Sequence, residues 1–316
     1  LAAARTAAAA ADMNRFRLYV SEEAHFSMHK AARLLGYASD NVRTVRVNSD
    51  FRMDVTDLER HIRADLDAGF QPACVVASAG TVNTGAFDPL NAIADIAAAH
   101  RLWMHVDGAY GGFSALSPSA KLLFAGIERA DSVSLDPHKW LYQSVGCGCV
   151  LYRQPETARA AFAHDADYTR PVGLTRDEAF AFWDYGPELS RPFRALPVWL
   201  QMKVFGTDAI AAAIEQNIRC ARYAGQLIED ASDFDLLAPV GLSIFCFRYR
   251  PADYDGDLDA LNERVLLALQ RAGSSYVSNT RIRGRFALRG CVLNYRTTEK
   301  DMERLVEDVR RAAAAL

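Results

Sequence analysis

Short apolar segments with the composition of β-strands recur along the first half of the chain, roughly every 30 residues, and helical segments separate them. Residues 73–78 form one such segment, an unbroken apolar run typical of a strand that is buried on both faces. Strands that alternate with helices predict a parallel sheet between two layers of helices. We therefore expect an α/β fold with a three-layer, mostly parallel sheet.

The pattern changes in the last third of the chain, where strands become denser and follow one another in pairs. This change predicts a smaller α+β domain packed against the first. We expect a major domain over residues 1–197 and a small C-terminal domain over residues 198–316. The small domain should contain strands at 234–237, 242–249, 275–278 and 285–293, with helices at 258–272 and 299–315.

Composition excludes several classes of partner. The 316 residues include 36 Lys and Arg against 39 Asp and Glu, and without a basic stripe this balance argues against nucleic-acid binding. The apolar runs are short and broken by charges, so we expect no membrane span and no signal peptide. The six cysteines lie mostly in apolar runs, which is typical of buried thiols in a cytoplasmic protein.

Polar side chains follow the ends of four predicted strands. Because the carboxyl ends of parallel strands meet at one edge of a sheet, where ligands bind, we expect these side chains to share one site. Pro137 ends the last of the four strands, since proline has no N–H for a further ladder bond, and presents Lys139 just beyond it. The four residues are His25, Thr81, Asp107 and Lys139.

An amine and a carboxylate in this arrangement suit pyridoxal phosphate (PLP). A lysine amine forms a Schiff base with its aldehyde, and an acidic group keeps its pyridine nitrogen protonated. Each residue also has a plainer interpretation. Asp107 could cap a helix, His25 could be a hydrogen-bonded structural histidine, and Lys139 could be a surface lysine. A metal site at His25 and His29 lacks a third ligand, so we expect no metal.

Four sequence stretches together resemble those of the group II PLP-dependent decarboxylases, which include aromatic-L-amino-acid, histidine, glutamate, cysteine-sulfinate and diaminobutyrate decarboxylases. The stretches occur in the family's order and at close to its spacing, and the resemblance covers essentially the whole chain. It implies the fold of the fold-type I PLP-dependent transferases. The four stretches are residues 24–27, 78–89, 105–110 and 136–140.

The resemblance also implies a role for each candidate residue. Lys139 would carry PLP as a Schiff base, and Asp107 would pair with the pyridine nitrogen. His25 would stack on one face of the ring and Ala109 on the other. The remaining predicted contacts are Thr81 near the ring hydroxyl, with Val82 where the family often has a second threonine, and Asp136 and His138 near the phosphate.

Tyr168 matches the tyrosine of the family's catalytic loop, which helps to protonate Cα after CO2 leaves. Aldehyde synthases of the family commonly have phenylalanine there, so Tyr168 favours decarboxylation to an amine, although it could also simply anchor the loop. We expect an amino-acid decarboxylase, with an aromatic amino acid as the leading substrate. Alternatives are aldehyde synthesis, transamination, lyase chemistry, or an impaired or non-catalytic dimerising protein. Arg191, Arg194 and Arg289 could bind a carboxylate or form structural ion pairs.

The first residues read as a helix without a preceding strand or cap. By the resemblance, we expect the chain to lack a Gly/Ser-rich phosphate-binding stretch and an N-terminal segment that packs on a partner subunit. Such a chain would bind PLP weakly. We also expect a homodimer with the active site near the subunit interface.

Overall fold

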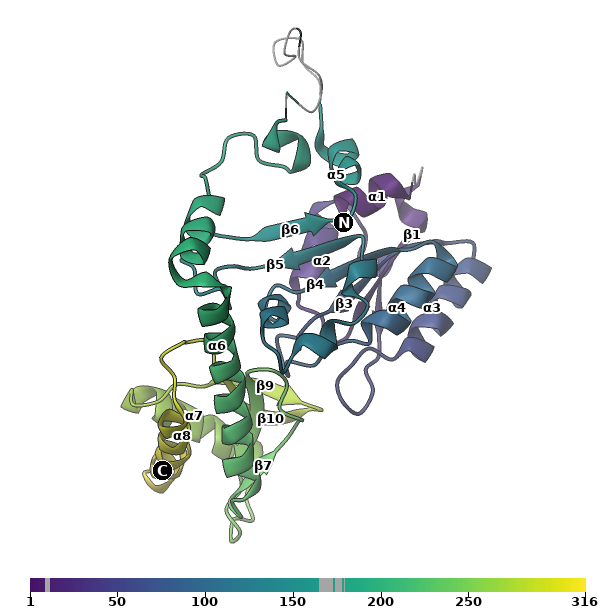
Figure 1. Ribbon diagram of the computed structural model, residues 1–316. Coiled ribbons are helices and arrows are strands. Elements are labelled where there is room, and N and C mark those ends of the chain that lie inside the picture. Colours follow the sequence, from purple (N-terminus) through teal and green to yellow (C-terminus); the bar gives the residue numbers. More distant parts are fainter. Residues whose placement is uncertain (9–11, 165–172, 174–177, 179) are drawn as a thin grey trace.

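Two β-sheets joined by a long helix make up the computed structural model, which describes all residues except 9–11, 165–172, 174–177 and 179 (Figure 1). Six strands form the first sheet in the order β2-β1-β3-β4-β5-β6. The first five are parallel, and β6 is antiparallel to β5. Their bounds are β1 Phe16–Ser21, β2 Val42–Val45, β3 Gln71–Ser78, β4 Trp103–Asp107, β5 Ser132–Leu135 and β6 Cys149–Tyr152.

Alternate residues of the central strands face two different cores. Leu18 and Val76 pack with residues of α1 (Ala2–Ala7) and α2 (Ser27–Leu34). Tyr19 and Val75 pack with residues of α3 (Val55–Asp67) and α4 (Leu90–His100), which lie side by side in Figure 1. The sheet therefore lies between two helical layers, which confirms the predicted α/β class. A further helix, α5 (Pro155–Phe162), follows β6.

Local sequence signals set the ends of several helices. Asp54 caps α3, because its carboxylate accepts hydrogen bonds from the backbone N–H groups of Thr56 and Asp57 at 2.9 and 3.3 Å. Pro89 is the N-cap of α4, as expected from its fixed φ. Short 3₁₀ helices connect the main elements at Met13–Arg15, Ser39–Asn41, Gly112–Leu116, Lys121–Phe124, Ile127–Arg129 and Phe182–Tyr185.

The second sheet is antiparallel, with the order β7-β8-β10-β9. Helices α7 and α8 pack against it through a separate apolar cluster that includes Val265 and Val309. This small α+β unit confirms the predicted change of architecture. The bounds are β7 Phe234–Leu236, β8 Ile244–Tyr249, α7 Leu258–Ala272, β9 Ser278–Ile282, β10 Arg285–Cys291 and α8 Glu299–Ala314.

One strand prediction is wrong in position. The strand expected at 275–278 lies instead at Ser278–Ile282, paired with β10. A two-residue turn fixes this register, because Arg283 and Gly284 both have positive φ, at 49° and 80°. Such turns match the twist of the strands that they connect.

Helix α6 (Ala195–Glu229) joins the two sheets (Figure 1). The sequence predicts separate helices over residues 193–205 and 207–230, and the structure confirms this break: α6 consists of two helical segments that meet at Gly206, whose backbone is non-helical with φ 75° and ψ 165°. Beyond this break, Ile210 and Ile214 pack into the core of the first sheet. The domain boundary predicted after residue 197 falls inside this helix and stays a prediction. Among the described helices, none is long and apolar enough to cross a membrane.

Candidate active site

The carboxyl ends of three neighbouring parallel strands lie level with one another. Asp107 is the register partner of Ser78 on β3 and of Ser134 on β5. Two backbone hydrogen bonds continue beyond the strands, from Ala79 N to Asp107 O at 2.8 Å and from Gly108 N to Ser134 O at 3.0 Å. The loops that follow these strands therefore start from one edge of the sheet, as the sequence predicted.

Asp107 is held by its neighbours through one of its two carboxylate oxygens. Its Oδ1 accepts hydrogen bonds from Ala109 N at 3.0 Å and from Ser134 Oγ at 3.2 Å. Both bonds end on Oδ1, so Oδ2 can accept a hydrogen bond from a further donor. Sequence reasoning missed Ser134, although its register position beside Asp107 was a usable signal. Gly108 allows the close approach of the two strands, because a Cβ there would lie 3.0 Å from Ser134 O.

Lys139 lies in a turn with an aspartate as its ion-pair partner. Its backbone N–H donates to Asp136 O at 2.9 Å, and its Nζ lies 2.9 Å from Asp136 Oδ2. The side chain is partly exposed. His138 Nδ1 donates to Cys147 O at 2.6 Å, which leaves Nε2 facing Asp136 Oδ2 at 3.7 Å. The structure thus groups Asp136, His138 and Lys139 in one polar cluster.

Thr81 is buried in the loop after β3. Its hydroxyl lies 3.1 Å from Thr84 Oγ1 and accepts a hydrogen bond from Ala86 N at 3.1 Å. Arg289 of the second sheet holds the same loop, since it donates to the backbone oxygens of Val82 and Asn83. Arg289 therefore has a structural role, one of the two interpretations that the sequence left open.

The other two arginine candidates also have partners within the chain. Arg194 forms an ion pair with Glu188 at 2.6 Å. The guanidinium of Arg191 lies over the ring of Phe182, 5.0 Å from its centroid. Both contacts are formed within the chain, as the structural interpretation of these arginines requires.

His25 is partly buried beyond the end of β1. Its Nδ1 lies 2.8 Å from Ser27 Oγ, and its ring centroid lies 4.3 Å from that of Phe26. Within the described residues, no hydrogen bond joins His25 or Thr81 to the groups around Asp107 and Lys139. Tyr168 lies outside the described residues.

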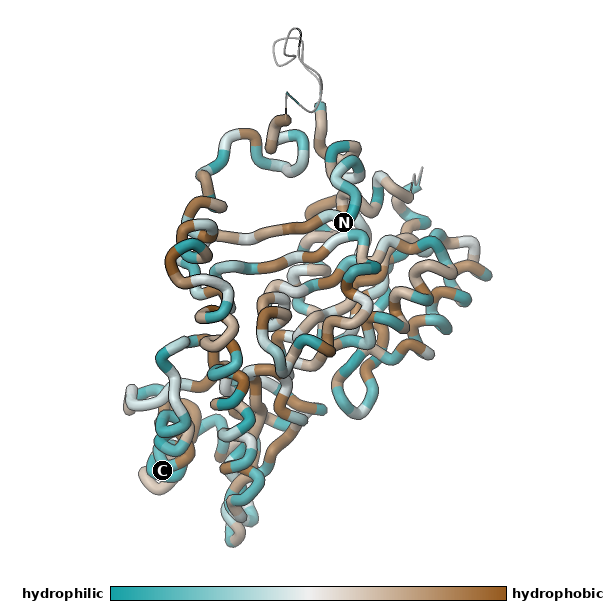
Figure 2. Tube along the Cα trace, in the orientation of Figure 1, coloured by the Kyte–Doolittle hydropathy of each residue, from teal (hydrophilic) through white to brown (hydrophobic). Residues whose placement is uncertain are grey.

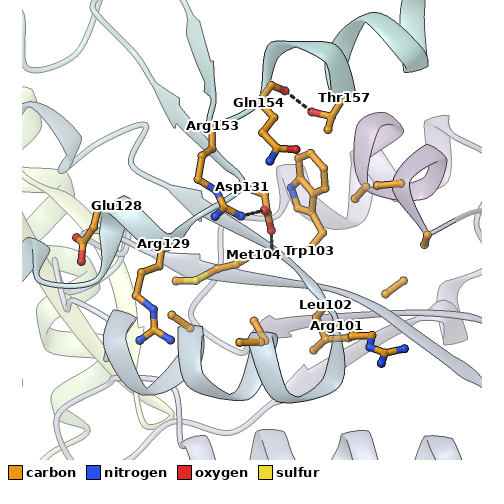
Figure 3. A pocket seen from close by; sticks show the side chains of 17 residues that line it. Arg101, Leu102, Trp103, Met104, Glu128, Arg129, Asp131, Arg153, Gln154 and Thr157 are labelled. Atoms are coloured by element: carbon orange, nitrogen blue, oxygen red, sulfur yellow. Dashed lines mark hydrogen bonds and ion pairs between the residues drawn. The ribbon is translucent and has the colours of Figure 1, made fainter.

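A cavity of about 500 Å³ opens at the opposite edge of the same sheet (Figure 3). It borders the start of β4 and is lined mainly by alanines and by charged side chains. Asp131 accepts hydrogen bonds there from Met104 N at 2.8 Å and from Arg153. Arg129 pairs with Asp95 at 2.7 Å. These paired charges stabilise the fold and do not form a candidate active site.

The donor set at the carboxyl edge fits PLP. The Lys139 amine matches the aldehyde, and the Asp107 carboxylate, whose Oδ2 accepts no hydrogen bond from the described residues, matches the pyridinium nitrogen. The imidazoles of His25 and His138 match the aromatic ring and the phosphate. In the part of the chain that the structure describes, no three His, Cys, Asp or Glu side chains gather closely enough to hold a metal ion.

Comparisons with known proteins agree with this chemistry. Residues 2–250 match the family model described as the pyridoxal-dependent decarboxylase conserved domain. The aromatic-L-amino-acid decarboxylase of Bacillus atrophaeus is 34% identical over 315 residues, which cover 99% of this chain and 66% of that protein. The L-2,4-diaminobutyrate decarboxylase of Rhizobium meliloti (strain 1021) is also 34% identical, over 94% of this chain and 59% of that protein.

A solved structure gives the same result. The crystal structure of Oryza sativa TDC with PLP and tryptamine superposes with a TM-score of 0.94 at 29% identity, over 99% of this chain and 67% of that one. The chain thus spans about two thirds of the length of the relatives that it matches. The family model covers most of the chain, including every described candidate for PLP binding, whereas Arg289 lies outside the matched range. The chain therefore belongs to the pyridoxal-dependent decarboxylase family.

Proposed function

We propose that the protein is a PLP-dependent carboxy-lyase that converts an L-amino acid to its amine and CO2. One observation carries the proposal: the amine of Lys139 and the carboxylate of Asp107 follow adjacent parallel strands at one edge of the sheet. Membership of the decarboxylase family gives this arrangement its chemistry.

Each candidate residue has a proposed task toward the cofactor. Lys139 Nζ would hold PLP covalently, and Asp107 Oδ2 would accept a hydrogen bond from the protonated pyridine nitrogen and so keep it protonated. His25 and Ala109 would contact the two faces of the ring, Thr81 would lie near the ring hydroxyl, and Asp136 and His138 near the phosphate. When bound, PLP supplies the electron sink for the electron pair that remains at Cα when the carboxylate departs.

The residues around Lys139 and Asp107 control charge during the reaction. Asp136 pairs with Lys139 Nζ, so the lysine must leave this partner and lose a proton before its amine can attack an aldehyde. Asp107 is fixed by Ala109 and Ser134, so its negative charge is already in place to keep the pyridine nitrogen protonated. Tyr168 would deliver the proton to Cα.

An aromatic amino acid is the proposed substrate. The relative from Bacillus atrophaeus is named for aromatic L-amino acids, and the Oryza sativa structure contains tryptamine, an aromatic amine. The relative from Rhizobium meliloti is named for 2,4-diaminobutyrate, which makes a diamino acid the next candidate. We propose a cytoplasmic location because all six cysteines are free thiols.

We further propose that the protein acts as a homodimer, with the active site near the subunit interface. β6, the last strand of the sheet, exposes Val150 and Leu151, and the first turns of α6 expose Trp199, Val204 and Phe205. Figure 2 shows hydrophobic colouring along β6 and at the start of α6. An exposed apolar surface of this kind is typical of a protein interface. Sedimentation should therefore show a dimer, and Val204→Asp should weaken it.

Carbon dioxide release from amino acids labelled at the carboxyl carbon tests the proposed activity. Purified protein with PLP should release CO2 and an equal amount of amine, fastest with an aromatic substrate. Ammonia and aldehyde in place of amine would instead identify an aldehyde synthase. Because Tyr168 favours the amine, Tyr168→Phe assayed in aerated buffer, where O2 serves as the two-electron oxidant, should shift the product toward aldehyde, ammonia and H2O2. Absence of CO2 from every amino acid, with PLP bound, would contradict the proposal.

A further inference from the structure

The turn that follows Lys139 is unusually constrained. Tyr142, three residues after the lysine, has a φ of 56°, in the left-handed region that aromatic residues rarely adopt. Its backbone N–H donates to Lys139 O at 3.3 Å, so its conformation is tied to that of the lysine. Such a conformation persists only where surrounding contacts impose it.

One buried side chain supplies the polar contacts on the far side of this turn. Asn217 of α6 is fully buried, and its Oδ1 accepts hydrogen bonds from Trp140 Nε1 at 3.1 Å and from Tyr142 Oη at 2.8 Å. Its Nδ2 donates to Asn294 O, after β10, at 2.8 Å. Asn217 thus connects the residues on the C-terminal side of Lys139 with the small α+β unit.

Packing and ring stacking also fix the position of the Trp140 side chain. It is fully buried, and its ring stacks on that of Tyr110 with centroids 5.1 Å apart and planes inclined by 5°. Tyr110 is in turn fixed by Ser243, whose Oγ lies 2.7 Å from its hydroxyl. The hydrogen bond from Trp140 Nε1 to Asn217 adds a directional polar contact at the edge of the indole.

We infer that Asn217 is a positioning residue for Lys139, through Trp140 and Tyr142. It holds the turn in its left-handed conformation and so keeps Nζ beside Asp136. Without Asn217, Tyr142 could relax out of this conformation, and Nζ would sample positions away from Asp136. The consequence for turnover rests on the proposed decarboxylase function, whereas the effect on the lysine does not.

The alternative is that Asn217 only stabilises the fold, as any buried, hydrogen-bonded asparagine does. Asn262 of α7 provides a matched control for this alternative. It is also fully buried, accepts from Tyr249 N at 2.7 Å, and donates to Tyr249 O and Leu258 O. All of its partners lie within the small α+β unit, away from the turn that carries Lys139.

The test compares Asn217→Ala with Asn262→Ala in the protein without PLP. Each lysine is acetylated with trace acetic anhydride over a range of pH, and mass spectrometry gives the labelling ratio of Lys139 to Lys300 on α8. We expect Asn217→Ala to raise this ratio several-fold, and Asn262→Ala to leave it unchanged although both variants unfold more easily. Equal ratios in the two variants would overturn the inference.

A second readout uses the enzyme with saturating PLP. Asn217→Ala should lower kcat on the order of 10- to 100-fold with little change in KM, because a misplaced reactive group slows chemistry more than binding.

If Asn217→Ala fails to fold, Trp140→Phe and Tyr142→Phe each remove one donor and should each raise the labelling ratio. Unchanged ratios in both would contradict the inference. If no variant and not even the wild type releases CO2, the proposed function fails while the labelling result still stands.

Discussion

The two edges of the six-stranded sheet carry similar residues but differ in how their carboxylates are paired. Asp131 precedes β5 at the amino edge, and protein donors bind both of its oxygens, from Met104 N and from Arg153. Asp107 ends β4 at the carboxyl edge, and within the described residues its donors, Ala109 N and Ser134 Oγ, bind only Oδ1. The amino edge also borders the cavity of Figure 3. The size of a cavity is therefore a poorer guide to function here than the pairing of charges.

The ion pairs at the two edges of the sheet also differ, as Lys139 and Arg129 show. Its ion-pair partner, Asp136, lies only three residues away in the same turn. Arg129 instead pairs with Asp95 on α4, and so joins two separate elements. A local ion pair on a turn can open without disturbing the fold, whereas a pair between elements stabilises it. The comparison leads to four predictions, from the largest expected effect to the smallest.

Lys139→Ala should abolish CO2 release. Loss of a residue that forms a covalent bond in catalysis lowers kcat by roughly 10⁴-fold or more. Labelled CO2 measured with saturating PLP gives the effect, and Lys121→Ala on an exposed turn is the control. Turnover by Lys139→Ala within tenfold of the wild type would remove the lysine from the mechanism.

Asp107→Asn should leave the fold intact and lower kcat on the order of 10²- to 10³-fold, the scale of removing one electrostatic stabiliser. The amide oxygen can still accept from Ala109 and Ser134, so only the charge is lost. Asp131→Asn, at the opposite edge, should leave kcat unchanged. Equal effects of Asp107→Asn and Asp131→Asn on kcat would mean that the two edges do not differ in function.

Asp131→Ala should act on stability and leave activity alone. It removes the acceptor of Met104 N, which is buried, and a buried donor without a partner costs about 1–3 kcal/mol. Urea unfolding should show this loss, while kcat of the folded protein stays at the wild-type value. A fall in kcat without a fall in the free energy of unfolding would give the amino edge a part in function.

Asp57 on α3 offers a test of a fully paired carboxylate near the carboxyl edge. Burial favours a higher pKa, but hydrogen bonds from the Arg46 backbone and from the Arg60 and Arg46 side chains lower the pKa of Asp57 to about 2. Its ionised form therefore stabilises the fold at neutral pH, by about 2 kcal/mol for a shift from the usual 3.8.

That contribution is fully present above the unfolded pKa, and it is lost as the pH falls from about 4 through 2. The difference in free energy of unfolding between wild type and Asp57→Asn should be constant near neutral pH and shrink over this range. A difference that does not change with pH would mean that the Asp57 charge contributes nothing to stability.

The sequence predicted the main sheet because its signals are local. Pro137 marks the turn after β5, and Asp54 and Pro89 mark the starts of α3 and α4. The shifted strand β9 was missed because its register depends on a left-handed arginine, Arg283, which has no compositional signal. The break between the two helical segments of α6 was predicted correctly, since Gly206 can adopt the positive φ that interrupts the helix.

For the candidate site, the sequence located residues but not their partners. Lys139 and Asp107 were recognised from motifs, and both follow the predicted strands. The ion pair of Lys139 with Asp136 and the bond of Ser134 to Asp107 depend on side-chain direction, which spacing does not give. Asn217 lies 77 residues from Trp140, too far for any local pattern to connect them.

The central claim is that Lys139 holds PLP at the carboxyl edge of the sheet. The most direct test is to add PLP to the purified protein, reduce it with borohydride and map the labelled peptide. With saturating PLP, we expect label on Lys139, an absorbance band that borohydride removes, and no label in Lys139→Ala. Label spread over exposed lysines such as Lys121 and Lys300, with Lys139 unlabelled, would contradict the claim.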